Sequence, residues 1–182
     1  MWSTNSEYTQ TNKKTLGLLL LFVTLESSAD VLVDVTATMV DPACNIRSEN
    51  SSSPMKIGFG TLNPEALSKS AVVKEFSLYI SGCNFNNALA IVLNPKGGST
   101  LLYNGKNILA TSTDGLGIDF KEVTGGTVRA LEMSKKQRIY PERVDATLYR
   151  MDLQAQLVNA VPINQLVLGK FTSTVTLAVT YN

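Results

Sequence analysis

Residues 169–182 read GKFTSTVTLAVTYN, and their pattern decides the fold class. Every second residue faces one side, and that side is mainly apolar, whereas the residues between are mostly small or polar. The residues on the apolar side are Gly169, Phe171, Ser173, Val175, Leu177, Val179 and Tyr181. A period of two predicts a β-strand with one buried face. No strand follows it in this sequence, so we expect its far edge to need a cover from elsewhere.

The composition narrows the classes of function. A length of 182 residues suits one domain, and the formal net charge of +1 gives no electrostatic footprint for nucleic acid. The chain contains no histidine, which removes the commonest general base and the commonest metal ligand. It also lacks a Gly-x-Ser-x-Gly motif, and has no Ser-x-x-Lys in a strand–turn–helix context. We therefore expect no enzymatic activity, no cofactor and no metal site.

The N-terminus has the pattern of an export signal. Lys13 and Lys14 precede an apolar run at residues 16–25, and Ser27-Ser28-Ala29 offers small residues for cleavage. We expect cleavage after Ala29, so that residues 1–29 are the signal peptide. A membrane anchor is the alternative, but the run has about ten residues where spanning needs roughly 20. We therefore expect no membrane insertion of the mature chain.

Cys44 and Cys83 are the two cysteines of the chain. In an oxidising compartment, two cysteines in a small domain usually pair. A disulfide closing a loop of about 40 residues would stabilise the fold by roughly 4 kcal/mol in the chain-entropy model. A free reactive thiol is the weaker alternative, because no histidine or flanking cation is present to lower its pKa.

The mature chain shows many short strands and no helical pattern of ten or more residues. Its first segment, residues 31–40, alternates with Val31, Val33, Val35, Ala37 and Met39 on one face. Further strands are predicted at 55–59, 73–83, 88–93, 101–103, 107–110, 116–120 and 147–158, with a hairpin turn at Asn104-Gly105. This pattern favours a single β-sandwich domain. Taken alone, the first and last strands fit an ordinary complete sandwich.

Several motifs in order resemble pilus (fimbrial) subunits of the chaperone–usher pathway. The resemblance is carried by PACNI at 42–46, FSLYISGC at 76–83, DGLGIDF at 114–120, MDLQAQL at 151–157, and by Gly169 with Tyr181. It extends over residues 31–182, and includes Cys44 and Cys83 as the family's cysteine pair. FGTLNPE at residues 59–65 looks most like minor or adaptor subunits of the P-pilus and type 1 kind.

The resemblance implies an incomplete immunoglobulin-like sandwich that lacks its seventh, C-terminal strand. Residues 30–41 would be an N-terminal donor-strand extension and residues 42–182 the pilin domain. The residues named above from Gly169 to Tyr181 would form an acceptor groove that also binds the chaperone. Val31, Val33, Val35, Ala37 and Met39 would plug the groove of a neighbour; the family has a central glycine where this chain has Ala37.

The implied function is that of a structural subunit of an adhesive fimbria, a minor or adaptor pilin that contributes to cell adhesion. Its partners would be a periplasmic pilus chaperone, an outer-membrane usher and neighbouring fimbrial subunits. It would pass through the periplasm to the cell surface. The intact segment 31–39 favours an internal position over an assembly terminator. The alternative is a single-domain tip adhesin that binds a host glycan, with Tyr103, Tyr140 and Tyr149 as scattered candidates.

Overall fold

A computed structural model describes residues 40–49, 54–97 and 99–182 of the chain. Nearly all of its regular structure is β-strand, as the sequence predicts. The described residues contain one short helix, α1 (Ala66–Lys69), and two 3₁₀ turns, η1 (Thr124–Gly126) and η2 (Ile163–Gln165). α1 begins two residues after Pro64. The segment 31–39 lies outside the described residues.

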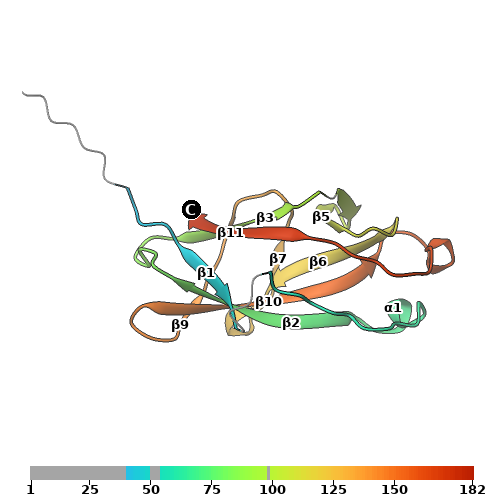
Figure 1. Ribbon diagram of the computed structural model, residues 1–182, viewed down its shortest axis with the longest axis horizontal. Coiled ribbons are helices and arrows are strands. Elements are labelled where there is room, and N and C mark those ends of the chain that lie inside the picture. Colours follow the sequence, from blue (N-terminus) through green and yellow to red (C-terminus); the bar gives the residue numbers. More distant parts are fainter. Residues whose placement is uncertain (1–39, 50–53, 98) are drawn as a thin grey trace, which may run out of the picture. The chain divides into compact units, whose positions relative to one another are not determined.

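The strands form two antiparallel sheets (Figure 1). The larger sheet has the order β1 (Asn45–Ser48), β2 (Val72–Ser81), β10 (Leu148–Asn159), β6 (Leu116–Glu122), β5 (Lys106–Ala110) and β4 (Thr100–Tyr103). Two short strands join it, β7 (Arg129–Leu131) beside β6 and β9 (Glu142–Arg143) beside β10. The smaller sheet has the order β11 (Val175–Tyr181), β3 (Leu89–Pro95) and β8 (Gln137–Arg138). The fold is the predicted immunoglobulin-like sandwich.

The core lies between the two sheets and follows the alternation of the sequence. On β2, Leu78 and Ile80 are buried. β10 runs antiparallel beside it and contributes Met151 and Leu153, both fully buried. Ile91 on β3 faces them from the other sheet and is also fully buried. Burial of each such side chain stabilises the fold by about 1.5–3 kcal/mol before ordering costs.

The predicted hairpin is present between β4 and β5. Asn104 and Gly105 form its two-residue turn, with φ of 49° and 78°. Two consecutive positive φ values suit a type I′ turn, whose twist matches that of the flanking strands. This hairpin is the outer edge of the larger sheet.

The sandwich is closed along one side by the segment between β7 and β8. The N–H of Met133 donates to Asn107 O on β5 (2.9 Å), and the N–H of Ser134 donates to Leu93 O on β3 (2.8 Å). Adjacent residues of this segment therefore bond to strands of different sheets. The chain itself thus covers the edges of β5 and β3 at this point.

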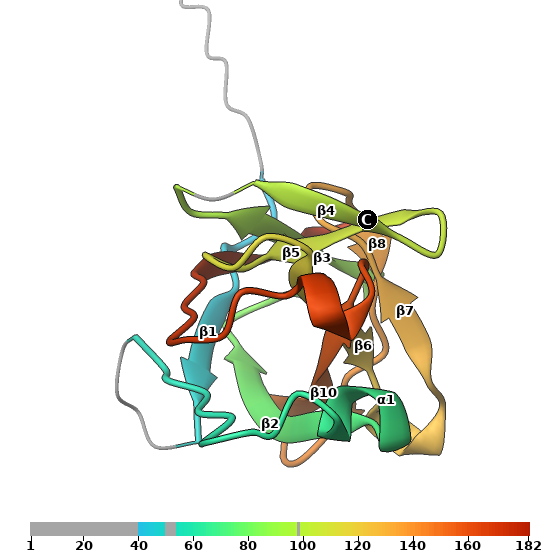
Figure 2. The same ribbon diagram turned by 90° about the vertical axis from the view of Figure 1, so that its right-hand side faces the viewer.

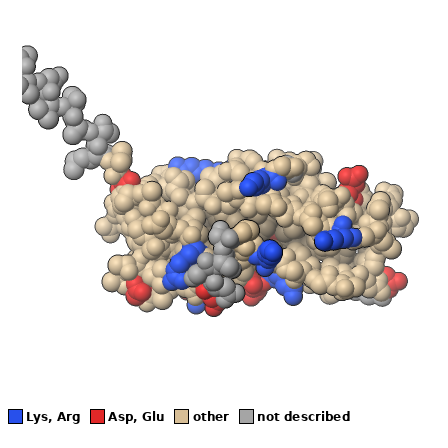
Figure 3. Space-filling model, in the orientation of Figure 1, with Lys and Arg blue, Asp and Glu red and all other residues tan. Residues whose placement is uncertain are grey.

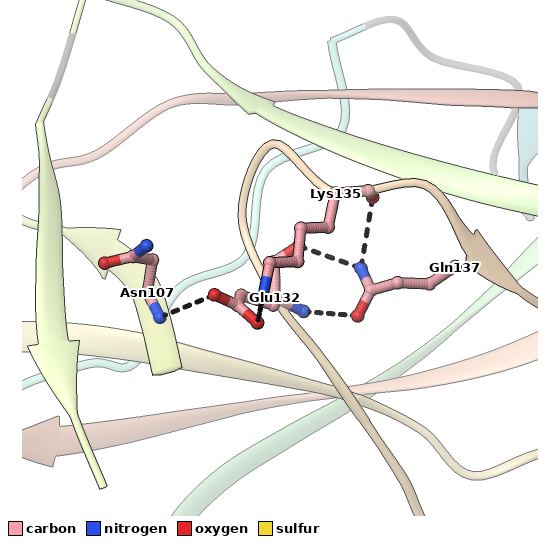
Figure 4. A network of polar contacts seen from close by, with 4 residues as sticks. All are labelled: Asn107, Glu132, Lys135 and Gln137. Carbon is pink, nitrogen blue, oxygen red and sulfur yellow. Dashed lines mark hydrogen bonds and ion pairs between the residues drawn. The ribbon is translucent and has the colours of Figure 1, made fainter. Parts of the chain in front are cut away.

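A polar network holds this crossing segment in place (Figure 4). Glu132 accepts hydrogen bonds from Lys135 Nζ (2.6 Å) and from the N–H of Asn107 (3.3 Å). Gln137 accepts from the N–H of Glu132 (2.7 Å) and donates to its carbonyl (2.8 Å). The hydrogen bond from Lys135 is the main cause that lowers the pKa of Glu132 below its ordinary value of 4.5.

Candidate binding edge at strand β11

Among the described residues, strand β11 has a partner along one edge only. It ends the order of the smaller sheet, with β3 as its neighbour. The flanking bonds fix which residues face β3: Lys96 N–H donates to Thr174 O (2.9 Å), and Asn182 N–H donates to Ala88 O (2.8 Å). Hydrogen-bonded pairs alternate along an antiparallel ladder, so the even-numbered residues of β11 bond to β3. The N–H and C=O groups of the odd-numbered residues therefore point to the opposite edge, where no described strand pairs.

The odd-numbered residues also carry the apolar side chains of the strand. Val175, Leu177, Val179 and Tyr181 pack against the core but are only half-buried. On the neighbouring strand β3, by contrast, Ile91 is fully buried. We call this set of four residues, with their outward backbone groups, the β11 edge. It combines unpaired backbone groups with incompletely covered apolar side chains.

Residues 54–61 lie near one end of this edge. Their side chains alternate as in a strand, with Met55, Ile57 and Phe59 half-buried, yet the segment is not paired in a ladder. The strand predicted at 55–59 is therefore wrong as regular secondary structure, because no neighbouring strand bonds to it. The ring of Phe59 lies 6.4 Å from that of Phe171, so this segment meets the chain just before β11.

At its other end the β11 edge is tied to the start of the described chain. The hydroxyl of Tyr181 donates to Pro42 O (2.5 Å) and accepts from the N–H of Asn84 (2.9 Å). The carboxylate of Asp41 accepts from Nδ2 of Asn84 (3.0 Å) and from Nδ2 of Asn87 (2.8 Å). These side-chain bonds have no local signature in the sequence, although the asparagine-rich stretch after residue 83 supplies the donors.

Cys44 and Cys83 form a disulfide next to these contacts, as predicted. Their Cα atoms are 4.6 Å apart and belong to the segments that flank β1 and β2. The disulfide links the residue just before β1 to the segment just after β2. With the hydrogen bonds of Asp41 and Tyr181, it fixes residues 41–44 at this end of β11.

The remaining predicted groove residues do not belong to the β11 edge. The prediction of one strand from Gly169 to Tyr181 is too long, because β11 begins at Val175. Ser173 Oγ donates to Ala110 O (2.6 Å), and Ser112 N–H donates to Thr172 O (2.9 Å). Thr172 and Ser173 thus bond to the end of β5 and to the residues just after it, because β3 extends only to Pro95.

Gly169 and Phe171 instead line a cavity of about 160 Å³ beyond the start of β11. Its other lining residues are Leu62, Pro64, Leu67, Thr113, Leu116, Leu157, Leu166, Val167 and Leu168. None of the described side chains that line this cavity is charged. We call it the end cavity.

The three tyrosines considered for a glycan site have different surroundings. Tyr149 stacks on Phe85 with ring centroids 3.8 Å apart. Tyr140 lies beneath the guanidinium of Arg129, which is 4.2 Å from its ring centroid. Tyr103 ends β4, in the outer hairpin. On the face shown in Figure 3, basic and acidic side chains are interspersed.

Comparison with known proteins identifies the family. A family model described as "Fimbrial protein" matches residues 33–182, and the chain belongs to this family. Members of this family are structural pilins rather than enzymes, and the family places the chain in a pilus at the cell surface. A search of curated protein sequences finds no match. No helix in the described part of the chain is long and apolar enough to cross a membrane.

Solved structures of pilus subunits share the fold. The P pilus rod subunit PapA is 13% identical with a TM-score of 0.53, over 77% of this chain and 99% of that chain. The P pilus adaptor subunit PapF is 21% identical with a TM-score of 0.53, over 79% and 98%. A subunit in the structure of a chaperone–usher pilus is 13% identical with a TM-score of 0.53, over 85% and 97%.

Proposed function

We propose that this fimbrial subunit is assembled by the chaperone–usher pathway and that a strand from another protein completes the β11 edge. A periplasmic chaperone supplies this strand first, and the N-terminal extension of a neighbouring subunit replaces it at the outer-membrane usher. Residues 30–41 of this chain are the extension that it offers in turn, with Val31, Val33, Val35, Ala37 and Met39 as the inserted side chains. Export through the periplasm follows removal of residues 1–29.

One observation carries this proposal: unpaired backbone groups and half-buried apolar side chains occur on the same residues of β11. An added strand would satisfy both at once, because its backbone would bond to the odd-numbered residues while its alternate side chains covered them. Edge strands that are long and apolar are otherwise a risk for uncontrolled association. The extended segment 54–61 fits the same interpretation, because no described strand pairs with it either.

The free energy gained by inserting such a strand is large enough to hold two subunits together. Burial of five modest apolar side chains at roughly 1–2 kcal/mol each contributes about 5–10 kcal/mol before ordering costs. The backbone bonds add to this by pairing groups that would be costly to bury alone. An inserted strand therefore binds tightly enough to hold subunits together.

A truncated chain tests the assignment of the extension. A variant that begins at Asp41 should keep its fold and disulfide and should still bind a synthetic peptide of residues 30–41. It should fail to form multimers, measured by light scattering, whereas the chain that begins at Asp30 should form them. If the truncated chain forms multimers to the same extent as the longer chain, the proposal is contradicted.

Within the fimbria we assign the chain a minor, adaptor position. This assignment is supported by residues 59–65, which resemble adaptor subunits and of which Phe59 contacts Phe171. Immunogold labelling of intact fimbriae tests it. Label at the tip or at junctions is expected, and uniform label along the shaft would show that the chain is a rod subunit.

A further inference from the structure

Val167 and Leu168 form an apolar surface that the fold leaves uncovered. Their exposed fractions are 74% and 72%, in contrast to the half-buried residues of the β11 edge. They follow η2 and line the end cavity together with Leu62 and Leu67. Single exposed apolar residues are common on protein surfaces. Adjacent ones beside an apolar cavity instead indicate an interaction surface.

This surface and the start of the described chain, at residues 40–44, lie at opposite ends of the sandwich. In Figure 1, β1 and the C-terminus lie at one end, and α1 lies at the other end. Figure 2 views the latter end, where α1 and the turn that contains η2 face each other. The surface lies beyond the start of β11, because Phe171, which precedes this strand, also lines the end cavity.

The position of this chain's own residues 41 and 42 determines where the domain of a neighbouring subunit can fit. At the Tyr181 end, Asp41 and Pro42 of this chain already occupy the space, held by Asn84, Asn87 and the Tyr181 hydroxyl. A neighbour that inserts its extension therefore has room for its own domain only at the end cavity. Subunits that repeat this contact form a head-to-tail filament.

The neighbour brings an apolar residue to this point. Val40 is 81% exposed and directly precedes Asp41, where the extension joins the domain. If Met39 is the last inserted side chain, Val40 of a second subunit emerges at the end cavity, beside Val167 and Leu168. In the filament, Val40 of one subunit would therefore cover Val167 and Leu168 of the next, and all three are exposed in a single chain.

We propose that Val167 and Leu168 form a docking surface for the domain of the neighbouring subunit, at the residue where its extension leaves that domain. This inference rests on the proposed strand insertion but concerns a second contact, between domains. The contact limits the angle between successive subunits. The inserted strand itself is the competing occupant of the surface, and the test separates the two.

The test compares two donors on one acceptor. The acceptor is the chain that begins at Asp41, and the donors are a synthetic peptide of residues 30–39 and a whole chain that begins at Asp30. The whole-chain donor carries a copy of residues 30–41 fused after Asn182 to fill its own acceptor site. We compare the unchanged acceptor with Val167→Ser/Leu168→Ser and with the control Leu102→Ser, which alters a residue of β4 that is 67% exposed.

We expect the double variant to bind the whole-chain donor at least fivefold more weakly and the peptide within twofold of the unchanged acceptor. Leu102→Ser should bind both donors normally. A donor with Val40→Ser should show the same loss on the unchanged acceptor and little further loss on the double variant, because the two changes remove one contact.

Equal losses for peptide and whole chain would overturn the inference, because the surface would then belong to the strand site. Equal binding of the whole-chain donor to the double variant and to the unchanged acceptor would also overturn it. Failure of the peptide to bind even the unchanged acceptor would instead contradict the proposed function.

Discussion

Leu177→Asp should abolish strand insertion while leaving the free chain folded. Leu177 occupies the middle of the β11 edge and is half-buried against the core. An inserted strand would cover what remains exposed, so a carboxylate there would be enclosed among apolar side chains. Burial of an uncompensated polar group costs about 2–7 kcal/mol, and a charge costs more. A cost of even about 4 kcal/mol corresponds to roughly 1,000-fold weaker binding.

The size of the effect depends on charge rather than on lost area. Complete burial of a leucine side chain is worth about 1.5–3 kcal/mol, and most of that is already gained in the free chain. Leu177→Ala should therefore weaken binding of the peptide only severalfold. Because Leu177 is not fully buried in the free chain, the aspartate carboxylate there keeps contact with water, so the variant should be less stable but still folded, which circular dichroism would show.

Fluorescence anisotropy of a labelled peptide of residues 30–41 measures the effect on the chain that begins at Asp41. The matched control is Thr176→Asp, because Thr176 is adjacent, exposed and paired through its backbone with β3. It should bind the peptide within about twofold of the unchanged chain. Equal peptide affinity of the two aspartate variants would refute the assignment of the odd-numbered face as the acceptor site.

Three further predictions concern stability, each measured by urea unfolding. Cys44→Ser should lower the free energy of unfolding by about 4 kcal/mol, and an unchanged value would show that the disulfide adds nothing. Tyr181→Phe loses the bond to Pro42 O and leaves the Asn84 N–H without its acceptor, so about 1–3 kcal/mol should be lost; a loss below about 0.5 kcal/mol would contradict this role. Glu132 has a lowered pKa in the folded chain, so its contribution is present above pH 4.5 and is lost as pH falls through the folded pKa. Glu132→Gln should therefore destabilise the chain at pH 7 and by less as the pH falls below 4.5, and a difference that grows on acidification would be evidence against the Lys135 contact.

The long strands could be predicted because local sequence and tertiary environment agree in them. The alternation at 147–158 becomes β10, where Met151 and Leu153 are fully buried. The Asn104-Gly105 turn was equally clear, because its residue types suit positive φ. In these elements the apolar face is covered by the chain's own core, so periodicity alone is sufficient.

The short strands could not be predicted from periodicity. β8 and β9 contain two residues each, and they exist only because β3 and β10 pair with them. The segment between β7 and β8 crosses from one sheet to the other through bonds of Met133 and Ser134. Such pairings join residues far apart in the chain and leave no local pattern of hydrophobicity.

The candidate site was predicted in part. Alternation correctly placed Val175 and Leu177 on one apolar face, but it also continued back to Gly169, where the chain leaves β3. The same kind of error occurred at 55–59, where the pattern is that of a strand but the described chain provides no partner. In both cases periodicity reports which side chains face the core, whereas a ladder depends on a neighbour.

Amide hydrogen exchange of individual β11 residues tests the central claim most directly. In the chain that begins at Asp41, the amides of Ala178 and Thr180 should be protected by β3, whereas those of Leu177 and Val179 should exchange rapidly. Addition of the peptide of residues 30–41 should protect Leu177 and Val179 and leave the other two amides nearly unchanged. Protection of Leu177 and Val179 before the peptide is added, or no gain of protection after saturating peptide, would contradict an open edge completed by a donated strand.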